Sequence, residues 1–88
     1  MRRNPEFLLR EVAGRQVVVP VGAMAGKFYG MLTLNASGAF LWQLLEQPQT
    51  VETLVQALCQ KYTVSQEVAQ ADVEKFLENL QPTGAIIE

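Results

Sequence analysis

The stretch Met31–Gln47, MLTLNASGAFLWQLLEQ, changes from the pattern of a β-strand to that of an α-helix at one residue. Up to Asn35, apolar positions recur with the period of two that is typical of a strand. Asparagine is among the best N-caps, because its side-chain oxygen accepts a hydrogen bond from a backbone amide of the first turn. We therefore expect Asn35 to end a strand and begin a helix. The apolar stripe of that helix is Phe40, Leu41, Leu44 and Leu45.

Two further strand patterns precede this junction. FLLREVAG (residues 7–14) combines apolar and branched residues with a final glycine that predicts a turn, and QVVVPV (residues 16–21) is dense in valine. Pro20 has no backbone N–H, so we expect its strand to lie at a sheet edge or to end there. GAMAG (residues 22–26) is typical of a flexible connection, and KFYGMLTL (residues 27–34) is the third predicted strand.

Two more helices are predicted after the first one, which Gln47–Pro48–Gln49 ends. Thr50 is placed to cap the second helix and Ser65 to cap the third. Pro82 and Gly84 close the third helix, and the tail AIIE forms a short strand or packs on the core. The apolar stripes are Val51, Leu54, Val55, Leu58 and Tyr62 in the second helix, and Ala69, Val73, Phe76, Leu77 and Leu80 in the third.

The element order predicts an α+β, winged-helix-like fold, in which a three-stranded antiparallel sheet is followed by three helices (βββααα). A chain of 88 residues is too short for two independent cores, so residues 1–88 form a single domain. The longest apolar runs are too short to span a bilayer, and no secretion signal is recognisable. One cysteine, Cys59, forms no internal disulfide, which favours a cytoplasmic location, and we expect its thiol to be packed or half-packed.

The composition argues against catalysis. The chain has no histidine, which removes the most common general base and metal ligand. Glu74 and Glu78 share one face of the third helix, but an acidic surface stripe is usually solvated. We therefore expect no catalytic residue, no metal and no cofactor.

Charge also weighs against nucleic acid, although a helix-turn-helix with a wing suggests it. A recognition helix needs cations for the phosphates. The third helix carries one lysine, Lys75, and four acidic residues, a net charge of −3. Residues 1–45 have five basic and two acidic groups (+3), whereas residues 46–88 have two basic and seven acidic groups (−5).

A small open sheet beside an amphipathic helix is compatible with a different role, peptide binding. An extended peptide can add to the exposed edge strand while its side chains enter the groove beside the helix. Open edges equally allow a homodimer formed by strand exchange. The pattern alone leaves peptide binding and a purely structural role open.

Three segments resemble the family of coenzyme PQQ synthesis protein D: LNASGAFLWQLLE, TVETLVQALCQKYTVS and ADVEKFLENLQPTGAI. With the upstream strands, the likeness covers residues 7–88. The resemblance implies the same winged-helix-like βββααα fold. The matching positions are Leu34, Asn35, Ser37, Gly38, Leu41, Trp42, Leu44, Leu45, Tyr62, Asp72, Val73, Phe76, Leu77, Leu80 and Gly84.

The resemblance also implies a function, that of a precursor-peptide recognition element. Such a peptide chaperone binds the leader of a ribosomally synthesised precursor peptide by β-strand addition and presents it to a separate modifying enzyme, often of the radical-SAM type. A winged-helix regulator that binds nucleic acid is the alternative. The implied peptide-binding residues, on the third strand and third helix, are Tyr29, Met31, Leu32, Thr33, Leu34, Asp72, Lys75, Phe76 and Asn79.

Overall fold

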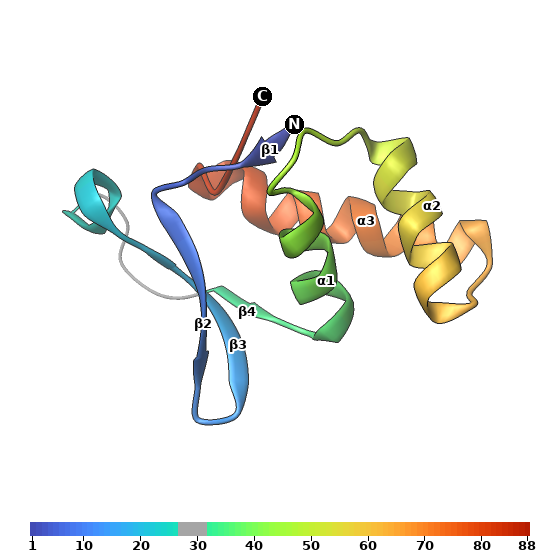
Figure 1. The fold of residues 1–88 in the computed structure, drawn as a ribbon, viewed down its shortest axis with the longest axis horizontal. Coiled ribbons are helices and arrows are strands. Elements are labelled where there is room, and N and C mark those ends of the chain that lie inside the picture. The colour runs from blue at the N-terminus through green and yellow to red at the C-terminus, as the bar shows by residue number, and fades with distance from the viewer. Residues whose placement is uncertain (27–31) are drawn as a thin grey trace.

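The computed structural model describes residues 1–26 and 32–88 (Figure 1). It has the predicted order of a three-stranded antiparallel sheet followed by three helices, and adds a pair of two-residue strands that joins the ends of the chain. The elements are β1 (Arg2–Arg3), β2 (Phe7–Val12), β3 (Arg15–Pro20), a 3₁₀ helix (Gly22–Gly26), β4 (Leu32–Leu34), α1 (Ala36–Leu44), α2 (Val51–Tyr62), α3 (Gln66–Leu80), a 3₁₀ helix (Gln81–Thr83) and β5 (Ile86–Ile87).

The main sheet has the strand order β2-β3-β4, with both pairs antiparallel. The β2–β3 hairpin projects away from the helices (Figure 1). It turns at Ala13 and Gly14, whose φ angles of 53° and 79° suit a two-residue hairpin loop. The strand that contains Pro20, β3, is the central strand of the sheet, so the prediction of an edge position is wrong. The other prediction, that the strand ends at Pro20, is confirmed. The segment predicted as a flexible connection, residues 22–26, is a 3₁₀ helix.

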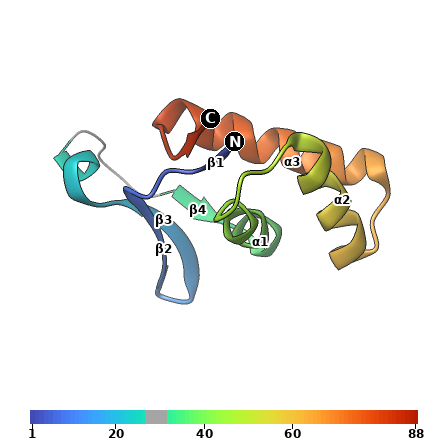
Figure 2. The ribbon, with the colours of Figure 1, turned by 45° about the horizontal axis from the view of Figure 1, so that its top comes forward.

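The second, smaller sheet pairs β1 with β5, so that Arg2 lies opposite Ile87. The predicted short strand in the C-terminal tail is thereby confirmed, whereas its partner β1 was not predicted. The side-chain amide of Asn4 adds a hydrogen bond of 3.0 Å to the carbonyl oxygen of Gly84. Both chain ends consequently lie side by side (Figure 2).

Each of the three α-helices begins directly after the predicted capping residue. The Oδ1 atom of Asn35 accepts from the Gly38 amide at 2.8 Å and from the Ser37 hydroxyl at 3.0 Å. Thr50 forms a reciprocal capping box with Thr53, and Ser65 accepts from the third residue of α3 at 3.2 Å. The strand-to-helix transition predicted at Asn35 is confirmed, since β4 ends at the residue before it and α1 begins at the residue after it.

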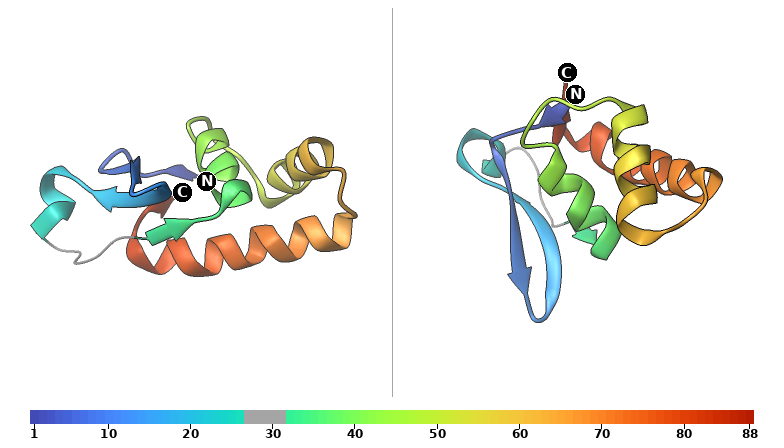
Figure 3. Two further views of the ribbon diagram at one scale, coloured as in Figure 1. Left: turned by 90° about the horizontal axis from the view of Figure 1, so that it is seen from below. Right: turned by 45° about the vertical axis from the view of Figure 1, so that its right-hand side comes forward.

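One apolar core lies between the sheet and the helices, and α3 runs beneath β4, α1 and α2 (Figure 3, left). Tyr62 differs from its predicted place in the buried stripe, because its side chain is 39% exposed at the last residue of α2 and meets Phe40 edge to face. Cys59 is half-buried and packs against the core, as expected. The buried residues of this core are Phe7, Val18, Leu41, Trp42, Leu45, Leu54, Val55, Leu58, Ala69, Val73, Phe76, Leu77, Leu80, Ala85 and Ile86.

Replacing the cap is expected to have a measurable cost. An Asn35→Ala variant should lose about 1 kcal/mol of the free energy of unfolding, because the Gly38 amide loses its partner. Urea denaturation followed by circular dichroism measures this loss. Asn35→Asp retains a capping oxygen and should stay close to the wild type. An unchanged midpoint for Asn35→Ala would contradict the assigned role of the cap.

Candidate functional site

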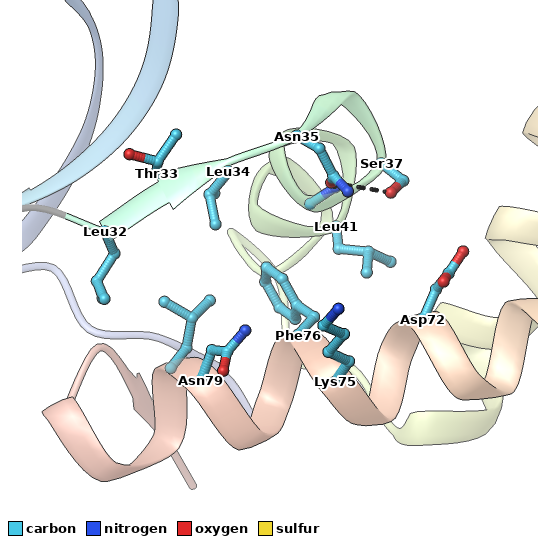
Figure 4. A pocket seen from close by; sticks show the side chains of 12 residues that line it. Leu32, Thr33, Leu34, Asn35, Ser37, Leu41, Asp72, Lys75, Phe76 and Asn79 are labelled. Atoms are coloured by element: carbon cyan, nitrogen blue, oxygen red, sulfur yellow. Dashed lines mark hydrogen bonds between the residues drawn. The ribbon is translucent and has the colours of Figure 1, made fainter.

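A groove of about 320 Å³ lies between the edge strand β4 and helix α3 (Figure 4). Its walls come from three elements, with β4 on one side, α3 on the other and the start of α1 at one end. The lining residues are Leu32, Thr33, Leu34, Asn35, Ser37, Gly38, Leu41, Asp72, Lys75, Phe76, Asn79 and Leu80.

The β4 wall offers both backbone and apolar side chains. In the part of the chain that the structure describes, β4 pairs only with β3, so its other edge faces the groove without a neighbouring strand. Successive side chains of a strand point to opposite faces. Leu32 and Leu34 are half-buried and point toward α3, whereas Thr33 is exposed and points away from it (Figure 4). An added strand would therefore meet backbone groups and leucine side chains together.

The α3 wall combines a buried aromatic ring with an exposed polar rim. Phe76 is 7% exposed, and its ring points across the groove toward β4 (Figure 4). Asp72, Lys75 and Asn79 are all exposed and lie on successive turns of the same face of α3. Buried Leu80 belongs to the core as well as to the groove. The floor is thus apolar and the rim is polar.

The first turn of α1 closes one end of the groove. Gly38 is buried there, and an added Cβ would lie 3.1 Å from Oδ1 of Asn35 and 3.3 Å from Cβ of Leu34. Glycine therefore lets the first turn of α1 approach the end of β4 closely. The capping bonds of Asn35 hold this junction.

Most of the residues predicted to bind a peptide lie together around this groove. Tyr29 and Met31 fall outside the described residues. The others are all groove-lining: Leu32, Thr33, Leu34, Asp72, Lys75, Phe76 and Asn79. Sequence reasoning did not include Asn35, Ser37, Gly38, Leu41 and Leu80 among them. The position of Asn35 directly after the strand β4 was a signal that the first turn of α1 would lie at one end of the groove.

The groove contains groups suited to binding. Its polar side chains are hydroxyl, amide, carboxylate and ammonium groups that can donate or accept hydrogen bonds. Within residues 1–26 and 32–88, no group of three or more acidic or cysteine side chains could hold a metal ion. Over the same ranges, no helix is both long and apolar enough to cross a membrane.

Comparison with known proteins identifies the family. Residues 8–86 match the family described as coenzyme PQQ synthesis protein D (PqqD). A solved structure, TbiB1 in complex with the TbiA(beta) leader peptide, has a similar fold, with a TM-score of 0.72 and 22% sequence identity. The similarity covers 97% of this chain and 93% of that one. No match was found among the curated proteins. Since the family match spans nearly the whole sequence, this chain belongs to the PqqD family.

Proposed function

We propose that this protein binds the leader of a ribosomally synthesised precursor peptide at the groove between β4 and α3. The observation that carries the proposal is an edge strand with an unpaired side among the described residues, next to an apolar groove. Edge strands bind extended peptides through main-chain hydrogen bonds, and the neighbouring groove accepts alternate side chains. Membership of the PqqD family, and a similar fold whose solved structure contains a leader peptide, support this role.

The protein then presents the bound leader to a separate modifying enzyme of the radical-SAM type. A binding role without catalysis agrees with a chain that has no histidine and with a groove built for recognition. We place the protein in the cytoplasm, where its single cysteine, a free thiol, would stay reduced. Omitting this protein should slow modification of the full precursor peptide by that enzyme but not of a leaderless core peptide.

The nucleic-acid alternative has less support. Glu67, Asp72, Glu74 and Glu78 are all exposed on α3, the helix that would have to approach the phosphates. An acidic helix repels the DNA backbone, which carries one negative charge about every 1.7 Å of duplex.

Strand exchange remains a prediction, and the structure limits the form it can take. The edge of β4 that would accept the leader would also accept a second copy, so dimerisation there should compete with leader binding. The β2 edge is less suited, although Leu8 and Val12 are exposed on it. A two-fold antiparallel pairing that sets Leu8 opposite the partner's Val12 would set Arg10 against its own copy, and like charges directly opposite destabilise a sheet.

Calorimetry tests the proposal directly. The probe is a synthetic leader peptide taken from a short reading frame near the gene of this protein where one is found there (the genomic leader), and a DNA duplex is the control. We expect saturable one-to-one binding of the peptide and no binding of the duplex. Binding of the duplex alone would favour the nucleic-acid reading and reject the proposal.

Blocking the groove should strongly weaken leader binding without affecting the fold. Asn79 and Glu78 are neighbours on α3 and both exposed, but only Asn79 lines the groove. In an Asn79→Trp variant the indole occupies the space of the added strand, so we expect at least a tenfold loss of affinity in calorimetry. Glu78→Trp is the matched control and should bind normally. Equal affinities for both variants would place the leader elsewhere.

A further inference from the structure

The α3 rim of the groove carries two opposite charges one turn apart. Asp72 and Lys75 are exposed, line the groove and extend from α3 on the side of the helix that faces β4 and α1 (Figure 4). Among the residues that the structure describes, neither side chain takes part in an ion pair or a hydrogen bond. Both charges are therefore available to a ligand.

The charged side chains of α3 are distributed unevenly between the groove and the rest of the helix surface. Lys75 is the only basic residue of α3, and it lies on the groove face. Three of the four acidic residues of this helix, Glu67, Glu74 and Glu78, do not line the groove. The groove thus presents one carboxylate and one ammonium group beside an apolar floor, on a helix that is otherwise acidic.

The spacing of these charges suits an extended chain. Asp72 and Lys75 are separated by a rise of about 4.5 Å along the helix axis. Alternate residues of a strand, which project to the same side, are about 6.6 Å apart. The flexible stem of Lys75 can span this difference, so residues i and i+2 of an added strand would meet Asp72 and Lys75 in turn.

The direction of the added strand sets the order of the two ligand charges. β4 runs from Leu32, opposite Asn79, toward Asn35, at the end of the groove where Asp72 lies (Figure 4). The main sheet is antiparallel throughout, and antiparallel pairing is slightly more stable per residue than parallel pairing. A strand added antiparallel to β4 reaches Asp72 first and Lys75 second.

We propose that the groove selects leaders with a basic residue followed two positions later by an acidic residue, both facing α3. This inference rests on the proposed function and names the chemistry of the peptide. The basic side chain pairs with Asp72. The carboxylate of the acidic side chain pairs with Lys75. The aliphatic part of the same acidic side chain covers the ring of Phe76. Rim charges of this kind act more on specificity than on affinity.

A charge exchange tests the inference with a library of random 12-residue peptides displayed on phage. The variant Asp72→Lys/Lys75→Asp keeps the net charge and alters only exposed side chains, so circular dichroism should show an unchanged fold. We expect the wild type to enrich basic-x-acidic sequences and the exchanged variant to enrich acidic-x-basic ones. A synthetic peptide of the wild-type consensus should bind the variant about tenfold more weakly, because two exposed ion pairs become like-charge contacts.

Two controls confine the result to the groove. Glu78→Lys, outside the groove on the same helix, should enrich the same sequences as the wild type. Asn79→Trp should fail to bind the enriched peptides.

The outcomes separate this inference from the proposed function. If the wild type and the exchanged variant enrich the same sequences, and Asn79→Trp prevents binding, then the charge selectivity is wrong and the groove still binds peptides. Enrichment of acidic-x-basic sequences by the wild type overturns the assigned order. If no protein enriches peptides that depend on the groove, while the genomic leader also fails to bind, then both proposals fail.

Discussion

A Trp42→Ala variant is expected to lose about 3–5 kcal/mol of the free energy of unfolding. Trp42 is 1% exposed and is among the largest fully buried side chains of the described core. A domain of 88 residues is stabilised by about 4–13 kcal/mol in total, so this loss removes a large share of its stability. Far-UV circular dichroism in urea measures the loss, because the substitution also removes the only tryptophan.

Tyr62→Ala provides the matched control for an aromatic side chain. The ring of Tyr62 is partly exposed and contacts Phe40 edge to face, with centroids 6.1 Å apart. Its removal should cost about 1 kcal/mol, the worth of one such aromatic contact. Equal losses for the two variants would contradict the assignment of Trp42 to the core.

A Phe76→Ala variant is expected to bind the leader at least tenfold more weakly than the wild type. Buried aromatic residues at the centre of an interface commonly contribute most of the binding energy. Phe76 provides the only aromatic ring among the described lining residues of the groove. Calorimetry with the genomic leader peptide, below the unfolding temperature of the variant, gives the change in Kd.

The Phe76→Ala substitution also lowers the stability of the fold. Its control must therefore be a variant that lowers the stability by a similar amount. Phe→Ala costs about 3–5 kcal/mol in a core, and Leu→Ala costs about 2–5 kcal/mol. Leu58 is 1% exposed on α2 and does not line the groove, so Leu58→Ala should weaken the fold without weakening binding. Equal losses of affinity for Phe76→Ala and Leu58→Ala would mean that Phe76 acts on the leader only through stability.

The helices could be predicted from the sequence because the signals that begin them are local. Asn35, Thr50 and Ser65 each cap a helix by accepting a hydrogen bond from the backbone amide three residues further on. The β2–β3 hairpin was accessible for the same reason, since its turn needs only Gly14 and the residue before it.

The elements that were missed depend on contacts distant in the sequence. β1 has two residues, too few for a pattern of alternation, and it exists because Ile86–Ile87 returns to pair with it. Tyr62 fits the stripe of α2 by spacing, but helical spacing does not tell where the packing partner of a helix ends.

The residues that line the groove could not be identified from the apolar pattern of α3 either. Val73, Leu77 and Phe76 all belong to one apolar stripe of α3, and all three are buried. Only Phe76 also lines the groove, because β4 lies across from it at that position. Periodicity identifies the buried face of a helix but not the part of it that stays accessible to a ligand. The pairing of the third strand with the third helix in one site follows from the family resemblance and not from the apolar pattern.

Because Asn35 alone joins β4 to α1, the connection between them cannot change length during evolution without moving α1. One extra residue between Leu34 and Ala36 would turn α1 by about 100° relative to β4 and carry Leu41 away from its place in the lining of the groove. Insertions and deletions should therefore be rare at this point in related proteins. They should gather instead at the hairpin turn, residues 13–14, and in the exposed part of the connection between α1 and α2, residues 46–48, where added residues leave both walls of the groove in place.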